Sequence, residues 1–246
     1  MNFQLTLPKE SWKTYWEEDL PWTYPELFYV NAEIFSRFAF KKLGLNSSHQ
    51  LLNVGCGPGF LEQLLAPKVK SIDSLDVSQQ MLVLLNQHTK NHSNVRGYPL
   101  QQPYTSLSFL SKKYDFFFLI STAQYYQSME ELKTLILEAM AISNPSGKLI
   151  LADLPPPDEK SRFFTLAIQG FLQALLGGYV WQYLTCYFRR SARKAFYNQQ
   201  AQITPHLTFT SKACEDLFQS MGLAYKRISQ PLSICPGRLN YVIHLR

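Results

Sequence analysis

The sequence predicts an α/β fold built on a mostly parallel sheet, with helices on both faces. Short apolar runs at 51–54 and 114–120 have the length and composition of strands that are buried on both sides. A further strand is predicted at 71–76, and segments of helical spacing follow at 60–65 and 79–85. This alternation of strand and helix is typical of a parallel sheet.

Length and charge set the broad class. The chain has 246 residues, enough for one α/β domain with a sizeable core, and no Pro-, Gly- or Ser-rich linker divides it. The net charge of +6 is concentrated around 189–194, which suits an anionic substrate group, a membrane surface or a solvated helix end. No recognised DNA- or RNA-binding motif accompanies this charge, so we expect no nucleic-acid partner.

The compartment is predicted from the cysteines and the first residues. The four cysteines stand singly, without the spacing of metal ligands, so no metal is expected. The first ten residues lack the basic start and apolar core of a secretory signal. We therefore expect a reduced, cytoplasmic setting.

The first strand, 50–54, runs into glycines at alternate positions, Gly55, Gly57 and Gly59. Glycine reaches backbone angles that other residues avoid, and without a β-carbon it lets the main chain lie against a ligand. The helix that follows presents free N–H groups beside the strand end. A ligand site is predicted here, and the alternative is a glycine turn that binds nothing.

The spacing separates two cofactor classes. A dinucleotide fingerprint requires its third glycine where this chain has Phe60. The run 50–60 instead resembles motif I of the class I S-adenosylmethionine-dependent methyltransferases. The resemblance implies that S-adenosylmethionine is the cofactor and that Asn53 and Cys56 bind it together with the glycines. Asn53 replaces the acidic residue usual in this motif, so it contributes a hydrogen bond but no charge.

The second strand ends at Asp76, about 20 residues past the glycine turn, where a carboxylate grips a ribose diol in doubly wound folds. Ser78 is the expected N-cap of the helix after it. The resemblance implies that Asp76 holds both ribose hydroxyls and that Val77 and Met81 line the adenine. The alternative is an exposed aspartate at a strand end.

The segment 94–104 resembles the third segment of the family, with Gly97, Pro103 and Tyr104 in register. Tyr98 stands where the family has its adenine-binding aspartate. The resemblance then leaves Leu100 to pack on the adenine ring and Gln101, or a backbone carbonyl, to meet its amine. Ser121 follows strand 114–120 at the switch point where ligands bind in open α/β sheets, and it completes the predicted cofactor set.

The resemblance covers roughly 50–154 and 208–246 and implies a Rossmann-like sheet of seven strands with the last antiparallel. A helix at 210–221 and strands at 223–228 and 240–245 complete this core. Three parts are predicted: an N-terminal helical lid (1–48), the core (49–154 and 207–246), and an inserted helical cap over the acceptor pocket (155–206).

The lid region holds three of the four tryptophans. Its aromatic residues are either a helix pair packed over the sheet or, by the resemblance, a lid with a ring facing the sulfonium. Tyr15, Trp16 and Tyr24 are the predicted lid residues at the substrate, and Tyr29 is a further candidate for the sulfonium. A helix is predicted at 31–43, ending at Gly44.

The insert carries no charged residue from 163 to 188, but a double glycine at 177–178 breaks it, so two helices fit better than a membrane span. In the family, insertions here cap the acceptor pocket. Ordinary core helices and a membrane-docking face through 163–194 are the alternatives. The predicted acceptor-binding residues of the insert are Phe164, Ile168, Phe171, Leu172 and Trp181.

His206 follows the insert and titrates near neutral pH, which makes it the candidate general base; an exposed loop histidine is the alternative. Tyr125 and Tyr126 stand in register with a His pair common in the family and are the other catalytic candidates, able to orient an acceptor or simply to cap a helix. Neither tyrosine is a strong base at neutral pH.

The sequence thus predicts methyl transfer to an O, N or C atom of a hydrophobic small molecule. Natural-product or polyketide-like acceptors compete with quinones and lipids. The alternative, which Asn53 and Tyr98 support, is a non-catalytic protein of the same fold with a regulatory or assembly role.

Overall fold

The computed structural model of this chain describes residues 25–157, 207–229 and 237–246. It also describes Trp16, Ile168, Leu232, Ser233 and part of the stretch 171–185.

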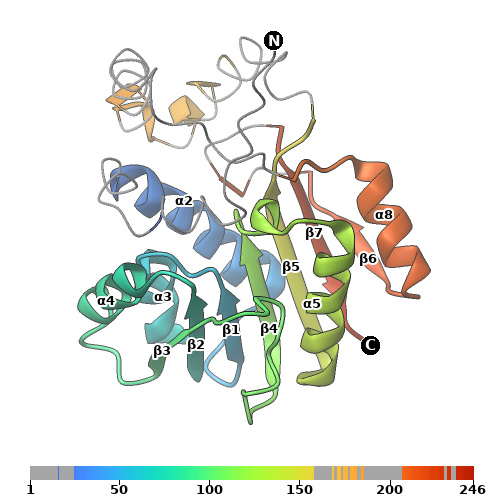
Figure 1. The fold of residues 1–246 in the computed structure, drawn as a ribbon. Helices are drawn as coiled ribbons and strands as arrows, with labels where there is room; N and C mark the ends of the chain where they lie inside the picture. Colours follow the sequence, from blue (N-terminus) through green and yellow to red (C-terminus); the bar gives the residue numbers. More distant parts are fainter. Residues whose placement is uncertain are drawn as a thin grey trace, which may run out of the picture.

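A seven-stranded sheet forms the centre of the molecule in the order β3-β2-β1-β4-β5-β7-β6 (Figure 1). β7 is antiparallel to both of its neighbours, and the remaining pairs from β3 to β5 are parallel. This confirms the predicted Rossmann-like α/β fold. The strands are β1 (Gln50–Val54), β2 (Ser71–Asp76), β3 (Val95–Pro99), β4 (Tyr114–Ile120), β5 (Ser143–Leu154), β6 (Tyr225–Arg227) and β7 (Leu239–His244).

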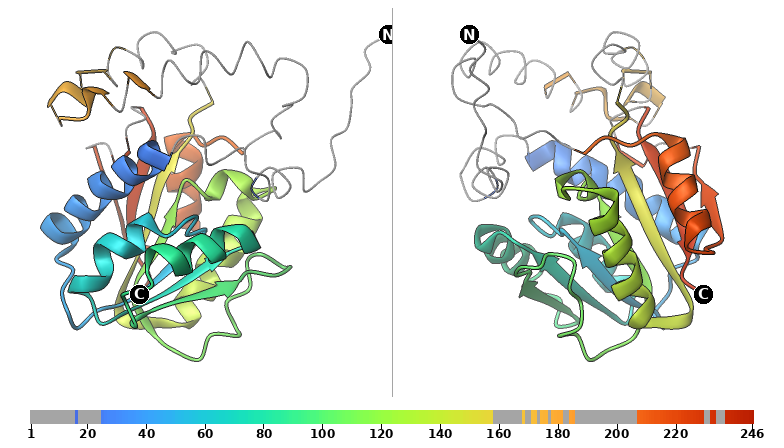
Figure 2. Two further views of the ribbon diagram at one scale, coloured as in Figure 1. Left: turned by 90° about the vertical axis from the view of Figure 1, so that its left-hand side faces the viewer. Right: turned by 45° about the vertical axis from the view of Figure 1, so that its right-hand side comes forward.

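Helices cover both faces of the sheet, as Figure 2 shows. On one face lie α2 (Pro25–Phe38) and α3 (Phe60–Leu65), with α4 (Gln79–His88) beside α3. On the other face lie α5 (Met129–Ala141) and α8 (Ser211–Ser220). Three short turns of helix join these elements: η2 (Ala39–Leu43), η3 (Ala66–Lys68) and η4 (Ala123–Tyr125).

Alternation along the strands explains the two layers. In β4, Phe117 and Leu119 join the core under α5 and α8, whereas Phe116 and Phe118 join the core under α2 and α3. Successive side chains of a strand point to opposite faces, so a continuous apolar run buries both. The predicted central strand is therefore sandwiched between helices.

The helix before the first strand is longer than predicted. It begins at Pro25, whose fixed φ suits the first helical turn, rather than at Asn31. Its last five residues widen into a π-helix, and Gly44 ends it with φ 71°. The predicted helix at 210–221 is found within one residue of its bounds as α8, and Thr210 caps it. Ser128 caps α5 in the same way.

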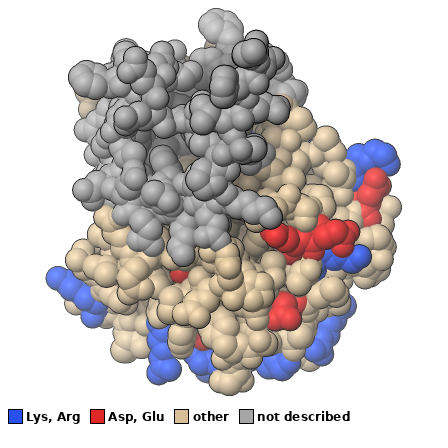
Figure 3. Space-filling model, viewed as in Figure 1, with Lys and Arg blue, Asp and Glu red and all other residues tan. Residues whose placement is uncertain are grey.

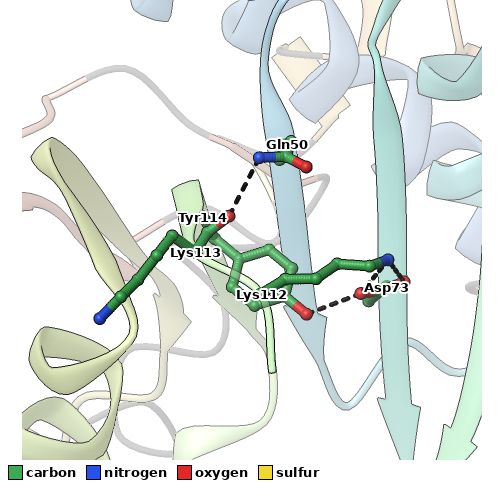
Figure 4. Close-up of polar contacts among 5 residues, drawn as sticks. All are labelled: Gln50, Asp73, Lys112, Lys113 and Tyr114. Carbon is green, nitrogen blue, oxygen red and sulfur yellow. Dashed lines mark hydrogen bonds and ion pairs between the residues drawn. The ribbon is translucent and has the colours of Figure 1, made fainter. Parts of the chain in front are cut away.

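A buried polar cluster ties β2 to β4 across β1 (Figure 4). The Asp73 carboxylate, 1% exposed, accepts from the Tyr114 hydroxyl at 2.6 Å and pairs with Lys112 Nζ at 2.8 Å. Gln50 Nε2 donates to the Lys113 carbonyl at 3.2 Å. The Tyr114–Asp73 bond joins β4 to β2, and the contacts of Lys112 and Lys113 tie the segment before β4 to β2 and β1. The cluster therefore helps to fix how the central strands lie relative to one another.

Two surface properties bear on partners. Among the described helices, none combines the length and the apolar character needed to cross a membrane. On the face seen in Figure 3, the lysines and arginines of the described residues are scattered along the lower rim and the right-hand side and do not form one patch.

Candidate active site

A cavity of about 670 Å³ opens at the carboxyl ends of β1, β2 and β4. Its volume lies within the range of about 300–1,000 Å³ that holds small-molecule ligands. Of the residues predicted from the sequence, the cavity is lined by Trp16, Asn53, Gly55, Cys56, Gly57, Asp76, Val77, Met81, Leu100, Ser121, Tyr125 and Tyr126. The structure thus brings the strand ends, the glycine turn and the two tyrosines together around one space.

The glycine turn is built as its spacing predicts. Gly55, Gly57 and Gly59 all have φ between 56° and 82°, a region that other residues rarely enter. A β-carbon on Gly59 would lie 2.9 Å from the Leu85 Cα, so this glycine lets α3 approach α4 and does not line the cavity. A β-carbon on Gly57 would meet no atom within 4 Å. Gly57 is therefore the position where the main chain borders open space in the cavity.

Asp76 sits at the end of β2 and is 8% exposed. Its Oδ2 accepts from the Gly57 N–H at 2.8 Å, and its Oδ1 accepts from the Ser78 N–H at 2.9 Å. These bonds fix the carboxylate against the glycine turn, and a carboxylate oxygen is an acceptor that a ligand hydroxyl can address. Ser78 Oγ also accepts from the Met81 N–H, which is the predicted helix cap.

Asn53 and Glu62 form a pair beneath the turn. The Asn53 Nδ2 donates to Glu62 Oε1 at 2.7 Å, and the Ser74 hydroxyl donates to the same oxygen at 2.9 Å. Both side chains are at most 4% exposed, and burial raises the pKa of the Glu62 carboxyl. The Asn53 Oδ1 is buried in a residue that lines the cavity, and it has no hydrogen-bond partner among the described residues. An acidic group is therefore present at this motif, but α3 supplies it instead of β1.

The side of the cavity that we predicted to hold adenine differs from the prediction at one residue. Val77, Met81 and Leu100 line the cavity, but Gln101 is exposed and does not. β3 ends at Pro99, and the Leu100 N–H is held by the Asp76 carbonyl at 2.8 Å, which turns Leu100 inward and leaves its neighbour outside. The part of the cavity wall that we assigned to Gln101 is formed by Gln102, Pro103, Tyr104 and Thr105.

Three aromatic residues of the cavity wall contact one another. The Trp16 ring makes edge contacts with Phe28 at 6.2 Å and with Tyr125 at 6.0 Å between ring centroids. The Trp16 carbonyl accepts from the Ser78 hydroxyl at 3.1 Å. Trp16 thus touches segments that follow both β2 and β4. Burial raises the pKa of Tyr126, so its phenol stays protonated at neutral pH and is no base.

Other predicted residues do not reach this cavity or fall outside the described residues. Tyr15, Tyr24, Phe164 and His206 lie outside the described residues. Tyr29 makes an edge contact with Phe60 and does not line the cavity. The predicted acceptor residues Ile168, Phe171, Leu172 and Trp181 are 38–79% exposed and are absent from the cavity wall.

The reason lies in how the insert packs. Its buried residues Ala174 and Tyr179 contact Val30 of α2, and the apolar residues between them face outward. An apolar face can be predicted from periodicity, but the element it packs against cannot.

Several lining residues were not predicted. Phe28, Asn31 and Phe35 come from α2, and Thr122 and Glu131 from the segment after β4. Leu232 and Ser233 come from the segment before β7. The signal for α2 was its aromatic content directly before the glycine motif; no sequence pattern marked Ser233.

Comparison with known proteins finds one matching family model. This model, described as a methyltransferase domain, matches residues 51–147, which span β1 to the first part of β5. The match agrees with the resemblance of the glycine turn to motif I of the class I S-adenosylmethionine-dependent methyltransferases. Among curated proteins, none matches the sequence.

Solved methyltransferase structures share the fold. The N-methyltransferase NodS from Bradyrhizobium japonicum, in complex with S-adenosyl-L-homocysteine, is 14% identical with a TM-score of 0.60, covering 96% of this chain and 97% of that chain. The DhpI-SAM-HEP complex is 12% identical with a TM-score of 0.61, covering 96% of both chains. A S-adenosylmethionine-dependent methyltransferase from Clostridium acetobutylicum is 12% identical with a TM-score of 0.58, covering 96% and 98%.

The residues that line this cavity fit S-adenosylmethionine, the methyl donor of class I methyltransferases. Gly57 leaves room for a ligand against the main chain, Asp76 offers carboxylate oxygens, and the Asn53 Oδ1 is a buried acceptor without a partner among the described residues. A ligand that carries hydroxyls and an ammonium group meets these needs, since each is a hydrogen-bond donor.

Proposed function

We propose that this chain transfers a methyl group from S-adenosylmethionine to an O, N or C atom of a hydrophobic small molecule. The observation that supports the acceptor class is the wall of the cavity beyond the glycine turn. Trp16, Phe28, Phe35, Ile120 and Leu232 make it largely apolar. Apolar walls with a few placed polar groups are typical of small-molecule sites.

Each group has a proposed role. S-adenosylmethionine supplies an electrophilic methyl group when it is bound. Asp76 holds the ribose, and the glycine turn lets the main chain approach the ligand. The cluster of Trp16, Phe28 and Tyr125 excludes water from the reacting atoms. Tyr126, kept protonated by burial, acts as a hydrogen-bond donor. Catalysis then consists mainly of alignment and exclusion of water.

The test is a transfer assay with methyl-deuterated S-adenosylmethionine. The purified protein is incubated with pooled apolar acceptors that carry hydroxyl, amine or activated carbon atoms, and labelled products are sought by mass spectrometry. We expect a labelled product that is lost in Asp76→Ala and retained in the exposed-site control Asp216→Ala. Tight cofactor binding without any labelled product would favour the non-catalytic alternative.

The exposed apolar residues of the insert favour a quinone or lipid as the second acceptor class. Leu172, Leu176 and Trp181 are 50–90% exposed within 163–194, the segment predicted to touch a membrane. The basic residues 189–194 lie outside the described residues. Co-sedimentation with anionic lipid vesicles tests this class, and Trp181→Ser should reduce binding if it is correct. No sedimentation of the wild type would favour a water-soluble acceptor.

The two described cysteines, Cys56 and Cys214, are buried free thiols. This supports, as a proposal, the reduced cytoplasmic setting expected from the sequence.

A further inference from the structure

Two neighbouring strands end in an unusual backbone conformation. Ser121, directly after β4, has φ 54°, and Asp153, near the end of β5, has φ 61°. They are the two residues other than glycine with positive φ among those the structure describes. Such conformations persist only where the surroundings hold them in place, and they cluster at functional sites.

The surroundings hold both residues. The Ser121 N–H donates to the Ala152 carbonyl at 3.0 Å, and the Asp153 N–H donates to Asn240 Oδ1 at 2.8 Å. The register between β5 and β7 shifts over the same residues, between Leu151 and Leu154. The ends of β4, β5 and β7 are thus locked into one arrangement.

This arrangement gathers two hydroxyls on one carboxylate. Asp153 is 6% exposed; its Oδ2 accepts from the Ser121 hydroxyl and its Oδ1 accepts from the Ser233 hydroxyl. The Arg238 guanidinium donates to the Asp153 carbonyl at 3.2 Å. Ser121 and Ser233 line the cavity, whereas Asp153 lies behind them.

The direction of these bonds determines what the wall can recognise. A serine hydroxyl has one proton and two lone pairs, and the proton of Ser121 is committed to Asp153. The Ser121 oxygen therefore faces the cavity as a hydrogen-bond acceptor. Its bond to the Asp153 carboxylate makes it a stronger acceptor. A wall of this kind stabilises a ligand that donates an O–H or N–H.

The place of the hydroxyls in the sheet relates them to the reaction. Across the order β2-β1-β4-β5, Asp76 ends β2 and Ser121 follows β4, on the other side of β1. Ser233, from the segment before β7, joins Ser121 through its bond to Asp153 of β5. A nucleoside held on Asp76 leaves this end of the cavity for the second substrate. The two polar ends therefore serve different ligands.

We propose that Ser121 and Ser233 form the polar part of the acceptor subsite and select acceptors that carry an O–H or N–H donor on an apolar body. With this proposal, Ser121 moves from the cofactor set, where the sequence placed it, to the acceptor. Asp153 is a positioning residue that fixes both hydroxyls with their protons turned away from the ligand. This inference rests on the proposed function, since it assigns the substrate class of the same cavity.

The test uses matched aromatic pairs that differ in one hydrogen-bond donor, such as 2-naphthol with 2-methoxynaphthalene and indole with N-methylindole. Binding to the protein saturated with S-adenosyl-L-homocysteine is measured by ligand-observed NMR. We expect the donor of each pair to bind about tenfold more tightly, the value of one hydrogen bond. In Ser121→Gly, which accepts φ 54° without strain, the preference should fall to about twofold or less. The exposed Ser220→Ala on α8 is the control and should keep it.

The variant Asp153→Asn separates positioning of the two hydroxyls from a purely structural role of Asp153, because only positioning predicts a changed ligand preference. Asparagine tolerates positive φ, but its amide turns one serine proton back toward the cavity. The preference for donors should then shrink while ligands that only accept gain affinity. Absence of a donor preference in the wild type, whether the pairs bind equally or not at all, overturns the inference. Failure to bind S-adenosyl-L-homocysteine in the same samples would instead overturn the proposed function.

Discussion

The side-chain amide of Asn53 lies 2.7 Å from the carboxyl of Glu62, so the first strand and the helix after the glycine turn share one buried hydrogen bond. Ser74 of β2 donates to the same carboxyl oxygen. The amide nitrogen of Asn53 is thereby directed at Glu62, and its oxygen remains as the acceptor. The motif keeps an acidic group, displaced by nine positions along the chain.

This pair should behave as a unit when its members are exchanged. Asn53→Asp places two buried carboxyls in contact, which should cost about 1–3 kcal/mol of stability, and Glu62→Gln alone leaves the amide orientation unfixed. The double variant Asn53→Asp/Glu62→Gln restores one carboxyl and one amide. Urea unfolding of the four proteins should give a favourable coupling of about 0.5–3 kcal/mol. Strict additivity would show that the two residues act independently.

The buried carboxyl should also make stability depend on pH. Burial raises the pKa of Glu62 despite the hydrogen bonds from Asn53 and Ser74. Because the folded pKa lies above the unfolded value of about 4.3, the stabilisation is fully present below that pH and is lost as pH rises through the raised pKa. Glu62→Gln should therefore gain stability relative to the wild type as the pH rises from about 4.3 through neutral. A difference in unfolding free energy that stays constant over this range would contradict the assignment.

Two glycines of one turn should fail in different ways. Gly59→Ala forces a β-carbon against the Leu85 main chain, so it should lower the melting temperature strongly. The β-carbon of Gly57→Ala would meet no atom within 4 Å. The substitution should therefore cost only about 1–2 kcal/mol of stability, which is the cost of placing a residue other than glycine in the left-handed conformation. The new β-carbon enters the cavity, so the affinity for S-adenosyl-L-homocysteine should fall more than the stability does. Equal losses of stability in the two variants would count against this division.

The Asp73 cluster should contribute to stability and not to the site. Asp73→Ala leaves the buried Tyr114 hydroxyl without its acceptor and breaks the pair with Lys112, at an expected cost of about 2–4 kcal/mol. The matched surface pair on α8, Lys212 with Asp216 at 3.0 Å, is exposed. Asp216→Ala should cost no more than about 0.5 kcal/mol. The midpoints of denaturant unfolding measure both costs. Similar losses of stability in the two variants would refute the special role of Asp73.

The parts of this protein that could be predicted from sequence are those built from contiguous residues. The glycine turn, Asp76 and the cap at Ser78 lie within a strand, a turn and a helix whose spacing carries the geometry. The alternating burial of 116–119 likewise follows from one strand alone.

The parts that could not be predicted depend on long-range packing. From the sequence, Glu62 is expected on the polar side of a short helix. Only the fold shows that its carboxyl accepts a hydrogen bond from Asn53 of the first strand. Ser233 reaches Asp153 over 80 positions of sequence. The apolar face of the insert was recognised, but its packing on Val30 of α2 was not, and four predicted acceptor residues do not line the cavity.

The most direct test of the central claim is calorimetry of S-adenosyl-L-homocysteine binding to the wild type and to Asp76→Ala, with Asp216→Ala as the control. The account predicts that loss of the Asp76 carboxylate weakens binding by about 1.5–3 kcal/mol, or roughly 12- to 160-fold, while the control binds like the wild type. Unchanged affinity in Asp76→Ala, or no binding to the wild type, would contradict it.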